Sequence, residues 1–93
     1  MKQKIQTEKG VSMEGKMIYF GSQICSQCVS ATKIIEKLNI EHIYVDITES
    51  THNMRQFLKL RDTREEFNDV KAMGLIGIPC FLMPDGSISF DLR

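Results

Sequence analysis

The sequence predicts an α/β domain with a four-stranded mixed sheet flanked by helices, in the order β-α-β-α-α-β-β. Short runs of β-formers alternate with stretches of helical periodicity. Two strands joined through a helix imply a parallel pair with a right-handed crossover. The last two strands are separated by the turn-forming residues 84–86, Pro-Asp-Gly, which imply an antiparallel hairpin.

The first half of the chain predicts two strands and one helix. Residues 17–20 are a run of β-formers that Gly21 closes, and we expect a short strand buried on both faces. Apolar residues then recur at helical spacing over residues 28–38, and Asn39 can end that helix in a left-handed conformation. Residues 42–46 predict a second strand.

The second half predicts two helices and two strands. Residues 47–51 can cap a helix that places Met54 and Phe57 on one face. Residues 63–66, Thr-Arg-Glu-Glu, match a capping box, which predicts the start of a further helix that Gly74 ends. Residues 80–83 predict a third strand, and residues 87–90 a fourth beside it.

Composition and charge are those of an ordinary globular domain. The chain has 93 residues, of which 42% are hydrophobic and 26% charged, and this length suits one core. Its 12 basic and 12 acidic residues cancel, so no nucleic-acid partner is indicated. No apolar stretch is long enough to span a membrane. We expect a flexible extension over residues 1–16, without a secretory signal, and a domain over residues 17–93 that is a cytoplasmic monomer.

The motif Cys25-Ser26-Gln27-Cys28 lies between the first strand and the first helix, a position suited to thiol redox chemistry. Amide N–H groups and the helix dipole favour a thiolate there, with pKa values of roughly 3.5–7.5 in such positions. Cys28 lies one turn into the helix, within reach of the Cys25 sulfur. We therefore expect Cys25 to be the catalytic nucleophile and Cys28 the resolving thiol.

Two other functions stay open on the residues alone. One is a zinc, copper or iron–sulfur site that uses Cys25, Cys28 and Cys80, completed by a ligand from outside the chain. The other is an interaction module without redox activity. We favour redox chemistry because a structural zinc site takes about four ligands and the chain has no second C-x-x-C or C-x-x-H. Cys80 can be a third redox thiol, a metal ligand or a small core residue, and burial is the commonest fate of a free cysteine.

The chain resembles the thioredoxin fold, and its short length resembles the glutaredoxins within that superfamily. The resemblance covers residues 16–92 and is carried by Cys25-x-x-Cys28, Ile78-Pro79 and the Asp85-Gly86 turn. It implies a glutaredoxin-like thiol–disulfide oxidoreductase that acts on disulfides of proteins or on glutathione mixed disulfides. It also implies a cis Pro79 that faces the C-x-x-C, although a trans proline is commoner on base rates alone.

The resemblance also assigns substrate-binding residues, and the chain departs from the family at some of them. Ser22 stands where many glutaredoxins have a lysine that binds glutathione, and Ser26-Gln27 replaces a usual Pro-Tyr. A Gly-Gly-x-x-Asp element is not evident after the last strand, and the usual C-terminal helix is missing. The expected substrate-binding residues are Ser22, Gln27, Ile78 and Pro79. Glutathione is a candidate co-substrate, and no metal or tightly bound cofactor is expected.

The remaining titratable residues receive no catalytic role. His42 and His52 lack metal-ligand spacing, so we expect both at the surface. A guanidinium from Arg55, Arg61 or Arg64 can bind a glutathione carboxylate, and the residues alone do not choose among the three.

Overall fold

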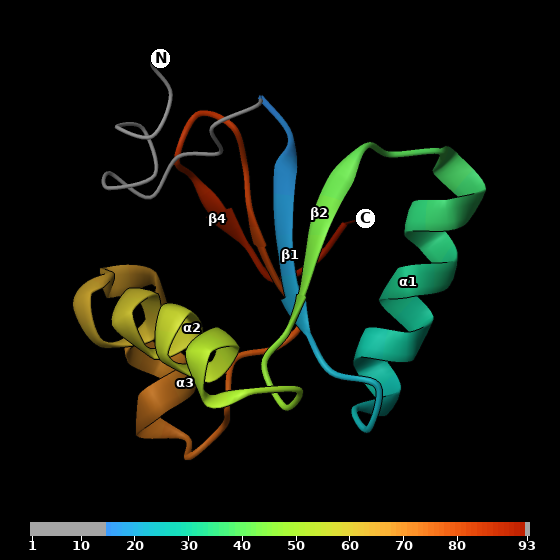
Figure 1. The fold of residues 1–93 in the computed structure, drawn as a ribbon. Helices are drawn as coiled ribbons and strands as arrows, with labels where there is room; N and C mark the ends of the chain where they lie inside the picture. The colour runs from blue at the N-terminus through green and yellow to red at the C-terminus, as the bar shows by residue number, and fades with distance from the viewer. Residues whose placement is uncertain (1–14, 93) are drawn as a thin grey trace.

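A computed structural model describes residues 15–92 as an α/β domain with a four-stranded mixed sheet (Figure 1). The strand order across the sheet is β2-β1-β3-β4. In chain order the elements are β1 (Met17–Gly21), α1 (Ser26–Leu38), β2 (His42–Asp46), α2 (Thr51–Thr63), the 3-10 helix η2 (Glu65–Phe67), α3 (Asn68–Ala72), β3 (Cys80–Leu82) and β4 (Ile88–Ser89). Helix α1 lies on one side of the sheet, and α2 and α3 lie on the other.

Strand β1 forms the centre of the sheet and fixes the register of its neighbours. It pairs in parallel with β2, so that Gly21 at its end lies opposite Asp46. It pairs antiparallel with β3, where Phe20 lies opposite Cys80, and β3 pairs antiparallel with β4. The predicted parallel pair and the predicted hairpin are both confirmed.

The alternation of side chains along the strands divides the core into two clusters. Tyr19 and Phe81 face α1, and their rings stack with centroids 5.2 Å apart. Phe20 faces the opposite side, where its ring lies 5.7 Å from that of Phe57 on α2. The α1 cluster contains Met17, Tyr19, Cys28, Ala31, Ile35 and Phe81. The α2 cluster contains Phe20, Ile47, Phe57, Phe67, Cys80 and Leu82.

The ends of the first two long helices follow from local side-chain chemistry. Asn39 ends α1 in the predicted left-handed conformation, with φ of 58°. The Ser50 hydroxyl begins α2 by accepting a hydrogen bond from the Asn53 amide at 3.1 Å. Both ends therefore lie where the sequence predicts them.

The predicted capping box at residues 63–66 is wrong. Thr63 is the last residue of α2, and its hydroxyl donates back to the Lys59 carbonyl at 2.7 Å. Glu66 binds the Arg64 guanidinium at 2.9 Å rather than the Thr63 amide. The chain turns to an extended conformation at Arg64, and the predicted further helix divides into η2 and α3.

The turn before the last strand forms as predicted, but the strand itself is shorter than residues 87–90. Gly86 has a φ of 91°, and the Asp85 carboxylate accepts from the Ser87 amide at 2.9 Å. Strand β4 comprises Ile88–Ser89, and the described residues hold no helix after it. Residues 1–14 of the predicted extension lie outside the described residues, as does Arg93.

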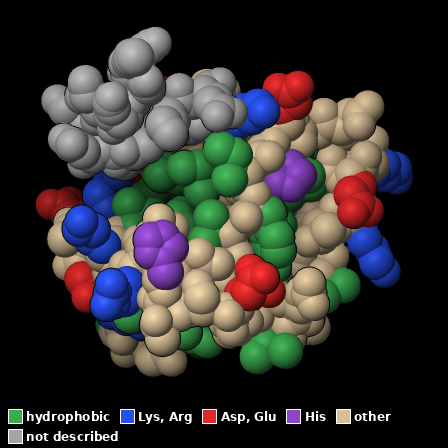
Figure 2. Space-filling model, viewed as in Figure 1, with side chains coloured by type: hydrophobic (Ala, Val, Ile, Leu, Met, Phe, Trp, Pro, Cys, Tyr) green, Lys and Arg blue, Asp and Glu red, His purple; other side chains and the backbone are tan. Residues whose placement is uncertain are grey.

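Charged side chains are interspersed on the surface. On the face shown in Figure 2, acidic and basic side chains are scattered, and hydrophobic side chains gather in the upper middle of the view. None of the helices in the part of the chain that the structure describes is long and apolar enough to cross a bilayer.

Gly21 leaves the space that the buried Tyr19 ring occupies. A Cβ at position 21 would lie 2.8 Å from Tyr19 Cε1. We expect Gly21→Ala to lower the free energy of unfolding by about 1–3 kcal/mol, because a closely packed core tolerates such overlap poorly. Chemical denaturation measures this loss. The penalty should shrink in a Tyr19→Leu background, and an equal penalty in both backgrounds would contradict this account.

Candidate functional site

Cys25 is the N-cap residue of α1. Its backbone is extended, with φ of −104° and ψ of 116°, and its carbonyl accepts the first helical bond from the Val29 amide at 3.0 Å. The Cys28 amide donates to the Cys25 sulfur at 3.3 Å. A sulfur in this position faces unpaired amide groups and the positive end of the helix dipole, both of which stabilise a thiolate.

Cys28 lies behind Cys25 in the α1 cluster and is only 1% exposed, whereas Cys25 is half-buried. Burial, with a smaller contribution from the hydrogen bond with the Cys25 side chain, raises the pKa of the Cys28 thiol to about 12. Cys28 is therefore a protonated thiol at neutral pH. The pair thus has one sulfur that solvent can reach and one sulfur that it cannot.

Tyr19 and Thr32 hold the first turn of α1, although sequence patterns single out neither residue. The Tyr19 hydroxyl donates to the Cys28 carbonyl at 2.7 Å, and the Thr32 hydroxyl donates to the same oxygen at 3.0 Å. The two hydroxyl oxygens are 3.0 Å apart. The position of Tyr19 is the one feature of the sequence that could have indicated this contact, because Tyr19 lies two residues before Gly21 on the strand that leads to the cysteine pair.

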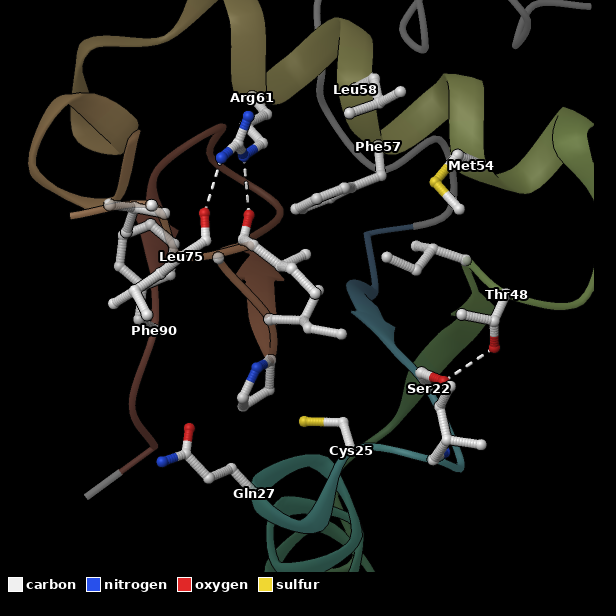
Figure 3. Close-up of a pocket in the computed structure, with 18 residues that line it drawn as sticks. Ser22, Cys25, Gln27, Thr48, Met54, Phe57, Leu58, Arg61, Leu75 and Phe90 are labelled. Atoms are coloured by element: carbon white, nitrogen blue, oxygen red, sulfur yellow. Dashed lines mark hydrogen bonds between the residues drawn. The ribbon is translucent and has the colours of Figure 1, made fainter. Parts of the chain in front are cut away.

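A groove of about 930 Å³ opens beside Cys25. It lies between the end of β1, helix α2 and residues 74–79, which form the segment before β3. Figure 3 shows the Cys25 sulfur pointing into this groove. The lining is mostly apolar and includes Ile24, Ile47, Met54, Phe57, Leu58, Leu75, Ile76, Ile78, Pro79 and Phe90. Its polar side chains are Ser22, Gln27, Thr48 and Arg61.

All four substrate-binding residues expected from the sequence line this groove together with Cys25. They are Ser22, Gln27, Ile78 and Pro79. The Ile78–Pro79 peptide bond is cis, as the resemblance implies. Within the described residues, the Ile78 amide and carbonyl make no hydrogen bond, so both are available to a ligand. Gln27 is exposed at the margin of the groove.

Ser22 is buried, and its hydroxyl bonds within the protein. Thr48 donates its proton to Asp46 at 2.6 Å, so the Ser22 hydroxyl donates to Thr48 at 2.7 Å. Ser22 in turn accepts from the Ile24 amide at 3.2 Å. The bonds from Thr48 also lower the pKa of Asp46. Ser22 therefore fixes the loop that leads to Cys25, and a direct contact with substrate stays a prediction.

Among the three arginines considered, Arg61 is the one that lines the groove. Its guanidinium donates to the Ile76 carbonyl at 2.8 Å and to the Leu75 carbonyl at 2.6 Å (Figure 3). Arg64 instead pairs with Glu66 and donates to the Gly86 carbonyl. Arg61 thereby ties the segment before β3 to α2.

Cys80 lies apart from the cysteine pair. It is fully buried in the α2 cluster, opposite Phe20, whereas Cys28 belongs to the α1 cluster across the sheet. Burial raises the pKa of its thiol to about 12. Across residues 15–92, no group of three or more His, Cys, Asp or Glu side chains could hold a metal ion. Cys80 therefore lies across the sheet from Cys28, because Phe81 and not Cys80 faces α1.

The two histidines lie away from the groove. His42 is half-buried, and its Nδ1 lies 2.9 Å from the Ile40 carbonyl. His52 is exposed on α2 beside Gln56.

The three thiols should differ in alkylation. At pH 7, iodoacetamide should modify Cys25 first, because Cys28 and Cys80 are buried and protonated. Raising the pH to 9 should leave these two slow, since their pKa values of about 12 are still higher. Peptide mass spectrometry follows each site, with unfolded protein as the control in which all three react. Equal rates for Cys25 and Cys80 in folded protein would contradict the structure.

Tyr19→Phe tests the bond to the Cys28 carbonyl. We expect it to lower the free energy of unfolding by about 0.5–1.5 kcal/mol, because one buried hydrogen bond is lost while Thr32 still donates. Tyr44→Phe is the matched control, since the Tyr44 hydroxyl bonds to Asp46 instead. Denaturant titration compares the two variants, and a larger loss for Tyr44→Phe would refute the assignment.

Comparison with known proteins places the chain beside one curated relative. No family model matches the chain, and no solved structure matches it. A protein of Haemophilus influenzae that is described as uncharacterized is 35% identical over 77 residues, which are 83% of this chain and 90% of that relative. At this identity and coverage, the chain belongs to the same family as the uncharacterized Haemophilus influenzae protein.

Proposed function

We propose that the protein is a glutaredoxin-like thiol–disulfide oxidoreductase with a thioredoxin-like fold. Cys25 is its nucleophile, Cys28 is its resolving thiol, and the substrates are disulfides of proteins or glutathione mixed disulfides. The observation that carries the proposal is the position of the Cys25 sulfur. It accepts the Cys28 amide at the start of α1 and opens onto a groove that Ile78 and Pro79 also line.

The topology supports the thioredoxin-like fold. The sheet has the predicted order of elements along the chain, with β1 parallel to β2 and β3 antiparallel to β4. The cysteine pair follows β1, and the cis Ile78–Pro79 bond precedes β3. Because β1 and β3 are neighbours in the sheet, these two segments meet at one end of it.

The reaction is thiol–disulfide exchange. The Cys25 thiolate attacks one sulfur of the substrate disulfide, that S–S bond breaks, and the departing sulfur leaves as a thiolate that takes a proton from water. Cys28 then loses its proton and attacks the Cys25 sulfur. The second substrate thiol is released, the substrate has gained two electrons, and the protein holds a Cys25–Cys28 disulfide. An external thiol such as glutathione reduces that disulfide for the next cycle.

The electrostatics suit this order of events. Burial chiefly raises the pKa of Cys28, and the hydrogen bond and charge of Cys25 add to the rise. Both contributions from Cys25 end when its sulfur enters a mixed disulfide. The Ser22 backbone and the Tyr19 hydroxyl, which lower the pKa of Cys28, remain. The resolving thiol therefore becomes more acidic only after the first exchange has taken place.

Substitution of each cysteine tests the proposal. Cys25→Ser should reduce turnover of bis(2-hydroxyethyl) disulfide to the uncatalysed rate, because no nucleophile remains at the groove. Cys28→Ser should retain the first exchange and accumulate a mixed disulfide on Cys25, which intact-protein mass spectrometry detects.

Cys80→Ala is the matched control, because its thiol lies in the α2 cluster and outside the groove. It should keep the wild-type turnover after correction for folded protein. Turnover that survives Cys25→Ser, or that disappears with Cys80→Ala in folded protein, would overturn the assignment of Cys25.

A further inference from the structure

We infer that the groove selects protein disulfides whose reacting cysteine is flanked by large apolar side chains, in preference to glutathione mixed disulfides. This inference rests on the proposed function and names the substrate class of the same site. It follows from the exposed apolar side chains around Cys25, from the charges in the groove and from the unpaired backbone of Ile78.

Large apolar side chains are exposed around the reactive sulfur. Ile24 is 84% exposed, Leu75 is 52% exposed and Ile76 is 58% exposed, and all three line the groove. Single exposed apolar residues are ordinary on a protein surface, but several around one groove mark a binding surface. Because Ile24 immediately precedes Cys25, a partner cysteine bonded to Cys25 places its neighbouring residues against this surface.

The charges in the groove do not suit glutathione. Glutathione is anionic, with a carboxylate at each end, and proteins bind such groups through arginine, lysine or free amides. Among the described residues that line the groove, Arg61 is the charged one, and two of its N–H groups already bind the Ile76 and Leu75 carbonyls. Ser22 is buried and donates to Thr48. The groove therefore complements an uncharged, apolar segment.

The Ile78 backbone supplies the directional contact. Its amide and carbonyl are without partners within the described residues, in the segment between Arg61-bound Ile76 and β3. An extended peptide can pair with such a backbone as an added strand does, while its alternate side chains occupy apolar pockets. The pairing is independent of sequence, so the apolar lining decides which peptides bind well.

Three mixed disulfides test the inference with reduced wild-type protein. The first joins mercaptoethanol to a peptide with leucine on both sides of its cysteine, the second to a peptide with glutamate in those positions, and the third to glutathione. We expect the leucine peptide to react about tenfold or more faster than the other two, in proportion to the apolar area that it buries. Each rate is divided by the rate with bis(2-hydroxyethyl) disulfide, which has no flanking side chains.

Ile76→Ser should lower this normalised rate for the leucine peptide by about threefold to tenfold, because an exposed apolar contact is lost. The normalised rate for glutathione should not change. Met73→Ser is the matched control, since Met73 is 70% exposed immediately before the same segment but does not line the groove. Because both side chains are exposed, neither substitution should unfold the protein.

The outcomes separate the inference from the proposed function. Slow reaction with all disulfides, including bis(2-hydroxyethyl) disulfide, overturns the proposed function and the inference with it. Normal reaction with that small disulfide, but glutathione equal to or faster than the leucine peptide, leaves the function standing and overturns the inference. An equal effect of Ile76→Ser and Met73→Ser on the leucine peptide also overturns it.

Discussion

The position of the Cys25 sulfur at the first turn of α1 is the constraint on which the rest of the site depends. The Cys28 amide holds this sulfur from the helix side at 3.3 Å, and the Ser22–Thr48 pair fixes the loop that leads to it. The second support originates in the sheet, because the parallel pairing of β1 with β2 brings Asp46 and Thr48 beside the end of β1. Tyr19 adds the bond that anchors the Cys28 carbonyl. A short network of hydroxyls thus sets the geometry of the site at which we propose the exchange chemistry of Cys25 and Cys28.

The sheet also separates the thiols by environment. Cys25 is half-buried and opens onto the groove, Cys28 is buried behind it against α1, and Cys80 is buried on the opposite side of the sheet. A nucleophile needs access and stabilisation of its thiolate, whereas a resolving thiol should stay protonated until the mixed disulfide has formed. The pKa of Cys28, raised by burial, provides the second condition. Cys80 is also protonated, but it is buried in the α2 cluster and does not line the groove, which agrees with a packing role next to Phe20.

Sequence patterns predict those features that depend on local interactions. The strands predicted over residues 17–20 and 42–46, the left-handed Asn39 and the Pro-Asp-Gly turn follow from periodicity and from the conformational preferences of single residues. The capping box at Thr63 is wrong because its hydroxyl has a competing local acceptor, the Lys59 carbonyl, which no pattern excludes. The side of the sheet on which Cys80 lies depends on the register of β3 with β1. The groove, the Ser22–Thr48 bond and the role of Arg61 join residues far apart in the chain, so they require the tertiary structure.

Disulfide mapping after mild oxidation tests the central claim, that Cys25 and Cys28 act as one redox pair, most directly. The reduced protein is equilibrated with oxidised dithiothreitol, blocked with iodoacetamide and digested under denaturing conditions for mass spectrometry. The account predicts one intramolecular disulfide between Cys25 and Cys28, with Cys80 recovered as a thiol that was protected until the protein was unfolded. A disulfide that includes Cys80 would contradict the account. So would the finding that Cys25 and Cys28 both stay reduced at every concentration of oxidised dithiothreitol.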